Sequence, residues 1–248
     1  MKVTVVTATF NAAHTLADCL GSVAAQTHPD IEHWVIDGGS RDGTAQVVAA
    51  HAQRMAGFVS EPDDGIYDAL NKGLRRATGD VVGFLHADDL YASPTTLARV
   101  AAAFDDPAVD AVYGDLLYVD KQDLGRIVRY WKAGPFERER MRAGWMPPHP
   151  TFYLRRSVYE RLGGFDTRYR ISADYDSMVR YLYAGRLNPA YIPEVLIRMR
   201  VGGASNRSLR NIVRKSKEDW RIVRSHGLGG AGTLIGKNLG KISQFWTR

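Results

Sequence analysis

The chain has 248 residues, 45% of them hydrophobic, with one cysteine and a formal net charge of +6. This length and composition suit one large domain, or a domain with a tail, and exclude a disordered chain, a fibrous repeat and a disulfide scaffold. The charge is uneven, because residues 205–248 carry ten Lys or Arg against two acids, a net +8, whereas residues 1–204 carry −2. Such a basic segment favours anionic partners: a membrane surface, a nucleic acid or a phosphate-bearing substrate.

The sequence predicts a cytoplasmic protein. The apolar run at Val3–Thr7 is too short for a signal peptide, and no stretch reaches the roughly 20 apolar residues of a membrane-spanning helix. The lone Cys19 lies in a segment of helical periodicity, where we expect a small core residue in a reducing compartment.

Apolar strands alternate with helical segments as far as about residue 116. Strands are predicted over Val3–Thr7, His33–Asp37, Gly57–Glu61, Val81–Leu85 and Asp110–Gly114. Helices are predicted over His14–Ala25, from Thr44 to about Arg54, over Ile66–Ala77 and after Ser93-Pro94. This alternation indicates an α/β fold with a mostly parallel sheet flanked by helices on both faces.

Polar clusters follow three of these strands, at Asp37, Glu61–Asp64 and Asp88–Asp89. In parallel α/β sheets the ligand crevice lies at the carboxyl ends of the strands. We therefore predict a ligand site at this edge of the sheet.

The alternation stops after about Leu117. Short strand-like pieces then mix with aromatic and basic residues, and two short helices are predicted over Ser157–Leu162 and Asp174–Tyr183. The C-terminal segment contains two amphipathic helical patterns. Their apolar positions are Leu209, Ile212, Val213, Trp220 and Val223 in one, and Leu234, Ile235, Leu239, Ile242, Phe245 and Trp246 in the other.

Asp88 and Asp89 are adjacent acids directly after an apolar strand. Carboxylates there are costly unless they are solvated or neutralised, and Mg²⁺ binds through one or two carboxylates plus substrate phosphates. Such an ion would clamp a diphosphate and stabilise its charge as it leaves. The alternative is a solvated turn in which Asp89 caps a neighbouring segment.

Asp37 precedes two glycines, which let the backbone approach a ligand closely. Its carboxylate can accept hydrogen bonds from a base or a ribose. A helix-start turn is the alternative. A dinucleotide site is excluded, because Gly38–Gly43 does not match G-x-G-x-x-G and follows the second strand, not the first.

Asp174 stands at a predicted helix start, where it is either a general base toward an acceptor hydroxyl or part of a helix cap with Ser172. His149 lies between two prolines and is either structural or a ligand for phosphate, metal or acceptor. The same alternatives hold for His86.

Together, several ordered motifs resemble the family 2 inverting glycosyltransferases of the GT-A fold. The motifs are Val5–Asn11, Val35–Thr44, Ser60–Gly73 with Ala77–Asp80, Phe84–Asp89, Pro148–Phe152, Gly163–Asp166 and Ser172–Asp176. Ser60–Gly73 is similar to a subgroup of colanic-acid, exopolysaccharide and glycolipid biosynthesis enzymes. The resemblance spans about residues 1–205.

The resemblance implies transfer of a sugar, with inversion, from a nucleoside-diphosphate sugar to a hydroxyl of a glycan or lipid-linked acceptor. The nucleotide is UDP in the best-known members, and the implied cofactor is Mn²⁺ or Mg²⁺. The implied organisation is a GT-A domain over residues 1–204, with a nucleotide-sugar-binding half at 1–116 and an acceptor-binding half at 117–204. A basic amphipathic helical tail follows at 205–248.

Individual positions carry over from the family's motifs. The positions that match nucleotide-sugar contacts are Ala8, Thr9, Phe10, Asp37, Gly65, Asn71 and Asp88. Asp88 and Asp89 match the metal-binding acids, and Asp174 matches the catalytic base. His149 and His86 are candidates for contact with the acceptor or a phosphate.

Three positions depart from the family pattern. The first acid of the D-x-D motif is His86, the second acid after the second strand is Gly38, and the glutamate before the base is Ala173. These departures leave open which of Asp88 and Asp89 contacts the metal, and which nucleobase is read.

Two other functions fit parts of the sequence. A sugar-phosphate nucleotidyltransferase would have a similar fold, but it would need a glycine-rich phosphate loop where Thr7–Asn11 has no glycine. A non-catalytic anion-binding or nucleic-acid-binding protein would use the basic tail. No nucleic-acid motif accompanies that charge, so we expect no nucleic-acid partner.

The basic tail favours peripheral contact with the inner face of a membrane, because basic amphipathic helices with Trp or Phe bind anionic interfaces. The same apolar stripes fit packing on the body of the protein or on a second copy. A homodimer therefore stays open.

Overall fold

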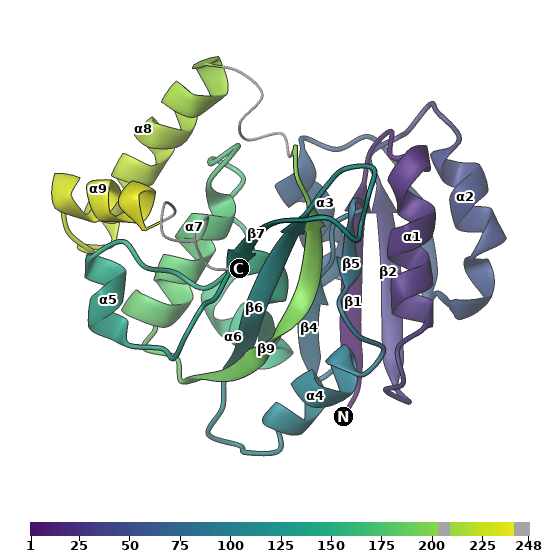
Figure 1. Ribbon diagram of the computed structural model, residues 1–248, viewed down its shortest axis with the longest axis horizontal. Coiled ribbons are helices and arrows are strands. Elements are labelled where there is room, and N and C mark those ends of the chain that lie inside the picture. The colour runs from purple at the N-terminus through teal and green to yellow at the C-terminus, as the bar shows by residue number, and fades with distance from the viewer. Residues whose placement is uncertain (203–208, 241–248) are drawn as a thin grey trace.

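A curled sheet of nine strands runs through the part of the protein that the computed structural model describes, residues 1–202 and 209–240 (Figure 1). The strand order is β3-β2-β1-β4-β8-β6-β9-β5, with β7 paired to β6. The strands are β1 Val3–Thr9, β2 Ile31–Asp37, β3 Gly57–Ser60, β4 Val81–Phe84, β5 Asp89–Tyr91, β6 Ala111–Val119, β7 Ile127–Trp131, β8 Tyr153–Arg155 and β9 Pro189–Arg200.

The first four strands are parallel, as predicted. Their register sets Thr9 of β1 beside Asp37 of β2, and Asp37 beside Ser60 of β3, so three strands end side by side. Beyond β4 the sheet is mixed, because β8 runs antiparallel to both β4 and β6 while β9 is parallel to β6. The predicted parallel character therefore holds for one half of the sheet.

Helices cover both faces of the sheet, which confirms the α/β class. They are α1 Ala13–Ala24, α2 Thr44–Ala50, α3 Ile66–Leu74, α4 Thr96–Ala103, α5 Arg138–Arg142, α6 Arg156–Leu162, α7 Ala173–Met178, α8 Leu209–Ser225 and α9 Ala231–Leu239, with short turns η1 Ala52–Arg54 and η2 His149–Thr151 and a π-helical continuation of α7, η3 Val179–Ala184. Side chains alternate along β1: Val3 and Val5 pack with α1 and α4, whereas Val6 and Ala8 pack with α3, α6 and α7. The strand periodicity thus builds two apolar layers.

The two predicted halves, residues 1–116 and 117–204, both contribute strands to the same sheet. β6 extends to Val119, beyond the predicted strand end at Gly114, and it crosses residue 116 without a break. The three-residue strand β5 was not predicted. It pairs with β9 at the edge of the sheet.

The described part of the predicted tail packs on the body. Helices α8 and α9 lie beside α7 and α5 (Figure 1), and Ile222 and Val223 are fully buried in the cluster that includes α7. The predicted apolar stripe of α8 is divided, because Val223 is buried whereas Val213 and Trp220 are exposed. The side chain of Leu209 and the positions Ile242, Phe245 and Trp246 lie outside the described residues. Among residues 1–202 and 209–240, none of the helices combines the length and apolar character that a bilayer crossing requires.

Close contact between α3 and the sheet depends on Gly73. A Cβ atom there would overlap Val6 Cγ1, whereas a Cβ at Gly21 of α1 would have no neighbour within 4 Å. We expect Gly73→Ala to lower the free energy of unfolding by about 1–3 kcal/mol through overpacking. Gly21→Ala, the matched control, should raise it by about 0.5–1 kcal/mol because Gly is a poor helix former. Urea denaturation measures both, and a Gly73→Ala protein as stable as the wild type would contradict this packing.

Candidate active site

The first group of predicted site residues gathers where β1, β2 and β3 end. The Asp37 carboxylate is only 1% exposed. Oδ2 accepts hydrogen bonds from the Ser40 amide (3.0 Å) and the Ser60 hydroxyl (2.6 Å), and Oδ1 accepts one from the Ser40 hydroxyl (2.5 Å). These bonds hold the Gly38–Ser40 turn against β3. The role of Asp37 as the acid that reads the nucleobase stays a prediction.

Two side chains flank Gly38 on the outside of this turn. A Cβ atom at Gly38 would overlap Asp63 Oδ2 and lie 3.3 Å from the Phe10 ring. Phe10 is 63% exposed, whereas Ala8 and Thr9 of the same predicted loop are buried.

Asp63 was not singled out from the sequence beyond its place in the Glu61–Asp64 cluster. Its Oδ1 accepts the Gly65 amide at 2.9 Å, and none of the hydrogen bonds among the described residues uses Oδ2. The sequence did contain a signal for Asp63. Gly38 stands where the family pattern has an acid, and the carboxylate of Asp63 occupies the space that a side chain at Gly38 would need.

Gly65 and Asn71 take different places around α3. Gly65 precedes the helix with φ +113°, a conformation that favours glycine, and its outer side is open. Asn71 pairs with the backbone of Phe165 in both directions, donating to the carbonyl at 2.8 Å and accepting the amide at 2.9 Å. Its amide therefore ties α3 to the Gly163–Asp166 segment, and the nucleotide-sugar contact of Asn71 stays a prediction.

The second group brings together residues far apart in the sequence. His149 Nδ1 lies 3.2 Å from Asp174 Oδ2, with both side chains partly exposed. The Tyr67 hydroxyl is shared between the Ile171 carbonyl (2.8 Å) and Asp174 Oδ1 (3.1 Å). Asp174 stands in the first turn of α7, and its carboxylate is oriented from two sides by other elements. Tyr67 was missed from the sequence, because only the fold brings α3 to α7.

His86 connects this group to the acids after β4. Its ring packs edge-on against the His149 ring, with 5.9 Å between the ring centroids. The charges of Asp88 and Asp174 both act on His86. Burial, followed by the neighbouring His149, lowers the pKa of His86 to about 4, whereas the two carboxylates act in the opposite direction. The imidazole is therefore neutral at pH 7, and its buried Nδ1 has no hydrogen-bond partner.

Asp88 and Asp89 have unlike surroundings. The half-buried Asp88 carboxylate takes part in none of the hydrogen bonds or ion pairs found within residues 1–202 and 209–240. Asp89 is 1% exposed with both carboxylate oxygens unpartnered, and burial, reinforced by the charge of Asp88, raises its pKa well above the usual range.

Arg200 contacts the backbone of Asp88, and its charge acts on the buried Asp89. It is 5% exposed at the end of β9, and it donates to the Asp88 carbonyl at 2.9 Å and to Asp18 Oδ2 at 2.5 Å. The sequence did not reveal Arg200, because its position depends on the pairing of β5 with β9.

The donor atoms around Asp88 are of the kinds that bind divalent cations. A free carboxylate and a neutral imidazole nitrogen at His86 are both ligands for ions such as Mn²⁺. In the part of the chain that the structure describes, no three His, Cys, Asp or Glu side chains converge as a ligand group. These two donors, Asp88 and His86, are the residues that could hold a divalent cation at this place.

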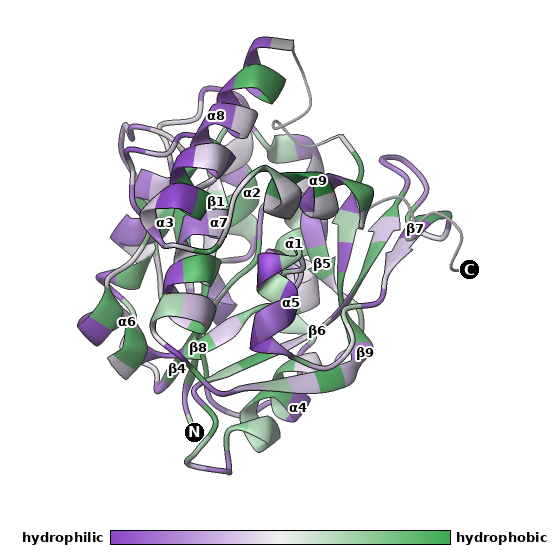
Figure 2. Cartoon of the chain, turned by 90° about the vertical axis from the view of Figure 1, so that its left-hand side faces the viewer, coloured by the Kyte–Doolittle hydropathy of each residue, from purple (hydrophilic) through white to green (hydrophobic). Residues whose placement is uncertain are grey.

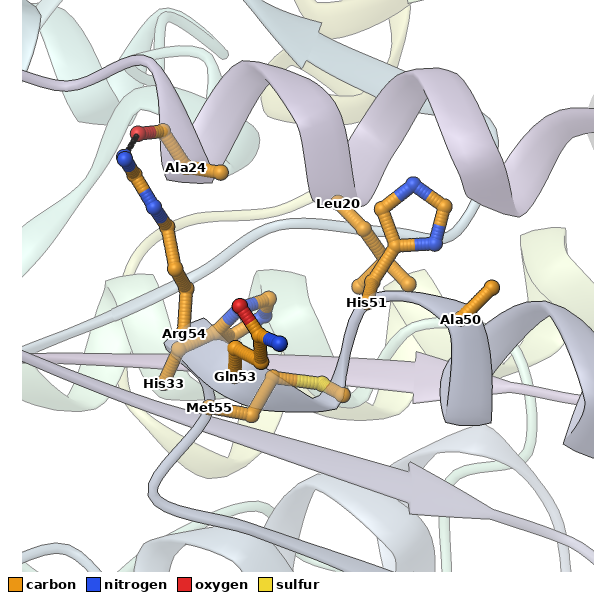
Figure 3. Close-up of a pocket in the computed structure, with 8 residues that line it drawn as sticks. All are labelled: Leu20, Ala24, His33, Ala50, His51, Gln53, Arg54 and Met55. Carbon is orange, nitrogen blue, oxygen red and sulfur yellow. Dashed lines mark hydrogen bonds between the residues drawn. The ribbon is translucent and has the colours of Figure 1, made fainter.

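A separate hollow of about 230 Å³ lies between α1 and the α2–η1 segment (Figure 3). It is lined by Leu20, Ala24, His33, Ala50, His51, Gln53, Arg54 and Met55. His33 lies near the start of β2, at the opposite end of the strand from Asp37. His33 pairs with the Thr7 hydroxyl, His51 with the Val47 carbonyl and Arg54 with the Ala24 carbonyl. Because these polar side chains of the hollow are already bonded within the protein, we place the candidate site at the carboxyl edge of the parallel strands.

Comparison with known proteins identifies the family of the chain. The family model for glycosyl transferase family 2 matches residues 4–163. The chain belongs to glycosyltransferase family 2. A PGL/p-HBAD biosynthesis glycosyltransferase of Mycobacterium tuberculosis is 34% identical over 203 residues, which cover 80% of this chain and 77% of the relative. An uncharacterized glycosyltransferase of Nostoc is 30% identical over 218 residues, covering 83% and 66%.

Solved structures that are similar to this glycosyltransferase confirm its GT-A fold. Staphylococcus aureus TarS 1–349 in complex with UDP matches with a TM-score of 0.67 and 20% identity, over 91% of this chain and 65% of that one. A mannosyltransferase from Pyrobaculum calidifontis, in complex with GDP-Man and Mn²⁺, matches with a TM-score of 0.68 and 25% identity, over 90% and 63%. The chain thus spans slightly less than two thirds of each of these structures.

Proposed function

We propose that this glycosyltransferase moves a sugar, with inversion, from a nucleoside-diphosphate sugar to a hydroxyl of a glycan or lipid-linked acceptor, assisted by Mn²⁺ or Mg²⁺. One observation carries the proposal: both groups of site residues lie at the carboxyl edge of the parallel strands, one after β2 and β3 and one after β4. β1 separates β2 from β4, so the groups are about 10 Å apart, within reach of one extended ligand. The UDP and GDP-Man complexes of the structural neighbours support a donor of this class.

The nucleoside would lie over the Gly38 turn. Phe10 offers an exposed ring for stacking, and Asp63 Oδ2 offers a free acceptor for an N–H of the base or a ribose hydroxyl. Asp37 would keep the turn in place through its serine bonds. We assign UDP first, since it is the nucleotide in the TarS complex.

The diphosphate and its cation would lie at Asp88. When bound, the cation offsets negative charge on the departing diphosphate. Asp88 is the first protein ligand in this proposal because its carboxylate is partly exposed and unpartnered, and His86 Nδ1 is the second candidate. Asp89 is buried behind it, so its predicted role as a metal ligand stays a prediction.

Asp174 would act as the general base. Its carboxylate takes the proton from the acceptor hydroxyl while the new bond forms at the anomeric carbon and the bond to the diphosphate breaks. Tyr67 and His149 hold that carboxylate in one orientation, and its side chain is 21% exposed, so it remains accessible.

Calorimetric titration of UDP, GDP and ADP with Mn²⁺, Mg²⁺ or EDTA tests the proposal. We expect metal-dependent binding of one nucleotide, with Asp88→Ala losing the metal dependence and Asp63→Ala weakening binding about tenfold, since one hydrogen bond to a charged group contributes about 1.5 kcal/mol. Asp174→Asn should bind the nucleotide normally but lose about 10²–10⁴-fold in turnover. Asp105→Ala, an exposed acid after α4, is the matched control. A folded protein that binds none of the three nucleotides would overturn the proposed function.

We further propose that the exposed face of α8 contacts an anionic membrane. This face presents Val213 and Trp220 beside Lys217, Arg221 and Arg224, all exposed. Figure 2 shows α8 at one end of the molecule, with mostly hydrophilic residues interrupted by hydrophobic positions along the helix. Basic residues interleaved with Trp suit a headgroup layer, where a lipid-linked acceptor would be met.

Vesicle sedimentation tests this surface. We expect pelleting with vesicles that contain about 30% phosphatidylserine, weakening at high salt and lost in Lys217→Glu/Arg221→Glu, because each basic residue contributes about 1 kcal/mol at such a surface. Lys121→Glu, on the β6–β7 turn, is the control. Equal pelleting with neutral vesicles would refute the idea, and a concentration-dependent doubling of mass by light scattering would indicate that a second copy covers the face instead.

A further inference from the structure

Glu218 of α8 is a buried acid whose hydrogen-bond partners among the described residues are all backbone amides. It is 6% exposed, and its carboxylate accepts hydrogen bonds from three consecutive N–H groups: Arg170 to Oε1 at 3.1 Å, and Ile171 and Ser172 to Oε2 at 2.9 and 3.0 Å. Successive backbone amides form a concave anion site. Here the anion comes from α8, which lies outside the matched region 4–163.

The three amides directly precede α7, in whose first turn Asp174 stands. Ser172 occupies the N-cap position without making a side-chain cap, so the start of this helix is held from outside. The Ile171 carbonyl shares the Tyr67 hydroxyl with Asp174, and the Glu218 charge acts on Tyr67 as well. Glu218, the segment 170–172, Tyr67 and Asp174 therefore form one connected group.

Further contacts fix α8 against α7. Ile222 and Val223 are fully buried, and His226 Nε2 lies 2.8 Å from Asp176 Oδ1. Asp219 lies 2.8 Å from Lys237 of α9, so α9 in turn holds α8. These contacts fix the position of Glu218. Its carboxylate is therefore suited to hold the backbone of residues 170–172 in place.

We propose that Glu218 is a positioning residue for the transfer reaction: by holding the backbone of residues 170–172, it sets where Asp174 stands relative to the acceptor hydroxyl. The inference rests on the proposed role of Asp174 as the base. A displacement of about 1 Å in such a group costs about a hundredfold in rate. Among the described residues, no hydrogen bond or ion pair joins Phe10, Gly38 or Asp63 to residues 170–172, so we expect the effect to fall on kcat and to leave the donor KM unchanged.

The test compares Glu218→Gln and Glu218→Ala with His226→Ala. Gln keeps the size but offers a single carbonyl oxygen to three N–H groups, and Ala offers none. His226→Ala removes a different contact between α8 and α7 without touching residues 170–172.

Three properties of each variant are measured well below its melting temperature. The first two are amide hydrogen exchange over residues 168–176 and the NMR signals of the His149 ring at fixed pH. The third is the kcat and KM for release of UDP or GDP from UDP-glucose, UDP-GlcNAc and GDP-mannose with Mn²⁺.

We expect faster exchange and a changed His149 signal in both Glu218 variants, because His149 reports the place of Asp174. The kcat should fall about tenfold in Glu218→Gln and about a hundredfold in Glu218→Ala, with KM for the nucleotide sugar within about twofold. His226→Ala should lower the melting temperature and leave kcat and the His149 signal unchanged. If kcat in all three variants follows only the loss of stability, the positioning role is wrong.

The two proposals fail in different ways. A wild-type protein that releases no nucleotide from any of the three sugars counts against the proposed function. The His149 signal then decides alone, and an unchanged signal in Glu218→Ala would overturn the placement of Asp174 by Glu218.

Discussion

The cost of keeping carboxylates away from water governs this structure, because several of them are collected around one edge of the sheet. Each is stabilised by a different device. Asp37 is bonded by two serines, Asp174 by Tyr67 and His149, and Glu218 by three backbone amides. A buried acid without such partners destabilises the fold or stays protonated, as the raised pKa of Asp89 indicates.

Asp88 differs from Asp37, Asp174 and Glu218, and in our proposal it marks where the cation binds. It is partly exposed, and its carboxylate has no protein partner within the described residues, while Arg200 holds only its carbonyl. Beside it, His86 stays neutral because burial outweighs the two nearby carboxylates. A partly exposed acid with no protein partner is suited to a ligand that arrives with the substrate, and in our proposal a cation bridging to phosphates meets that requirement.

The sequence predicted those features of the fold that local residue patterns determine. Four parallel strands, the polar residues at their ends and the helices between them follow from periodicity and turn residues, and the order of motifs predicted the family. The missed features are pairs that only the fold creates: Tyr67 with Asp174, Arg200 with Asp88, and Asp63 in the room left by Gly38. The helical character of the tail was predicted, but the apolar pattern could not reveal that α8 also turns two acids, Glu218 and Asp219, toward the body.

The central claim is that a nucleotide and its cation bind at the carboxyl edge between Phe10 and Asp88. A crystal structure of the protein with UDP and Mn²⁺, read by anomalous scattering from manganese, tests it most directly. The account predicts a manganese peak about 2–2.5 Å from an Asp88 oxygen, the diphosphate beside it and the base against Phe10. Manganese away from Asp88, or the nucleotide in the hollow between α1 and α2, would contradict it.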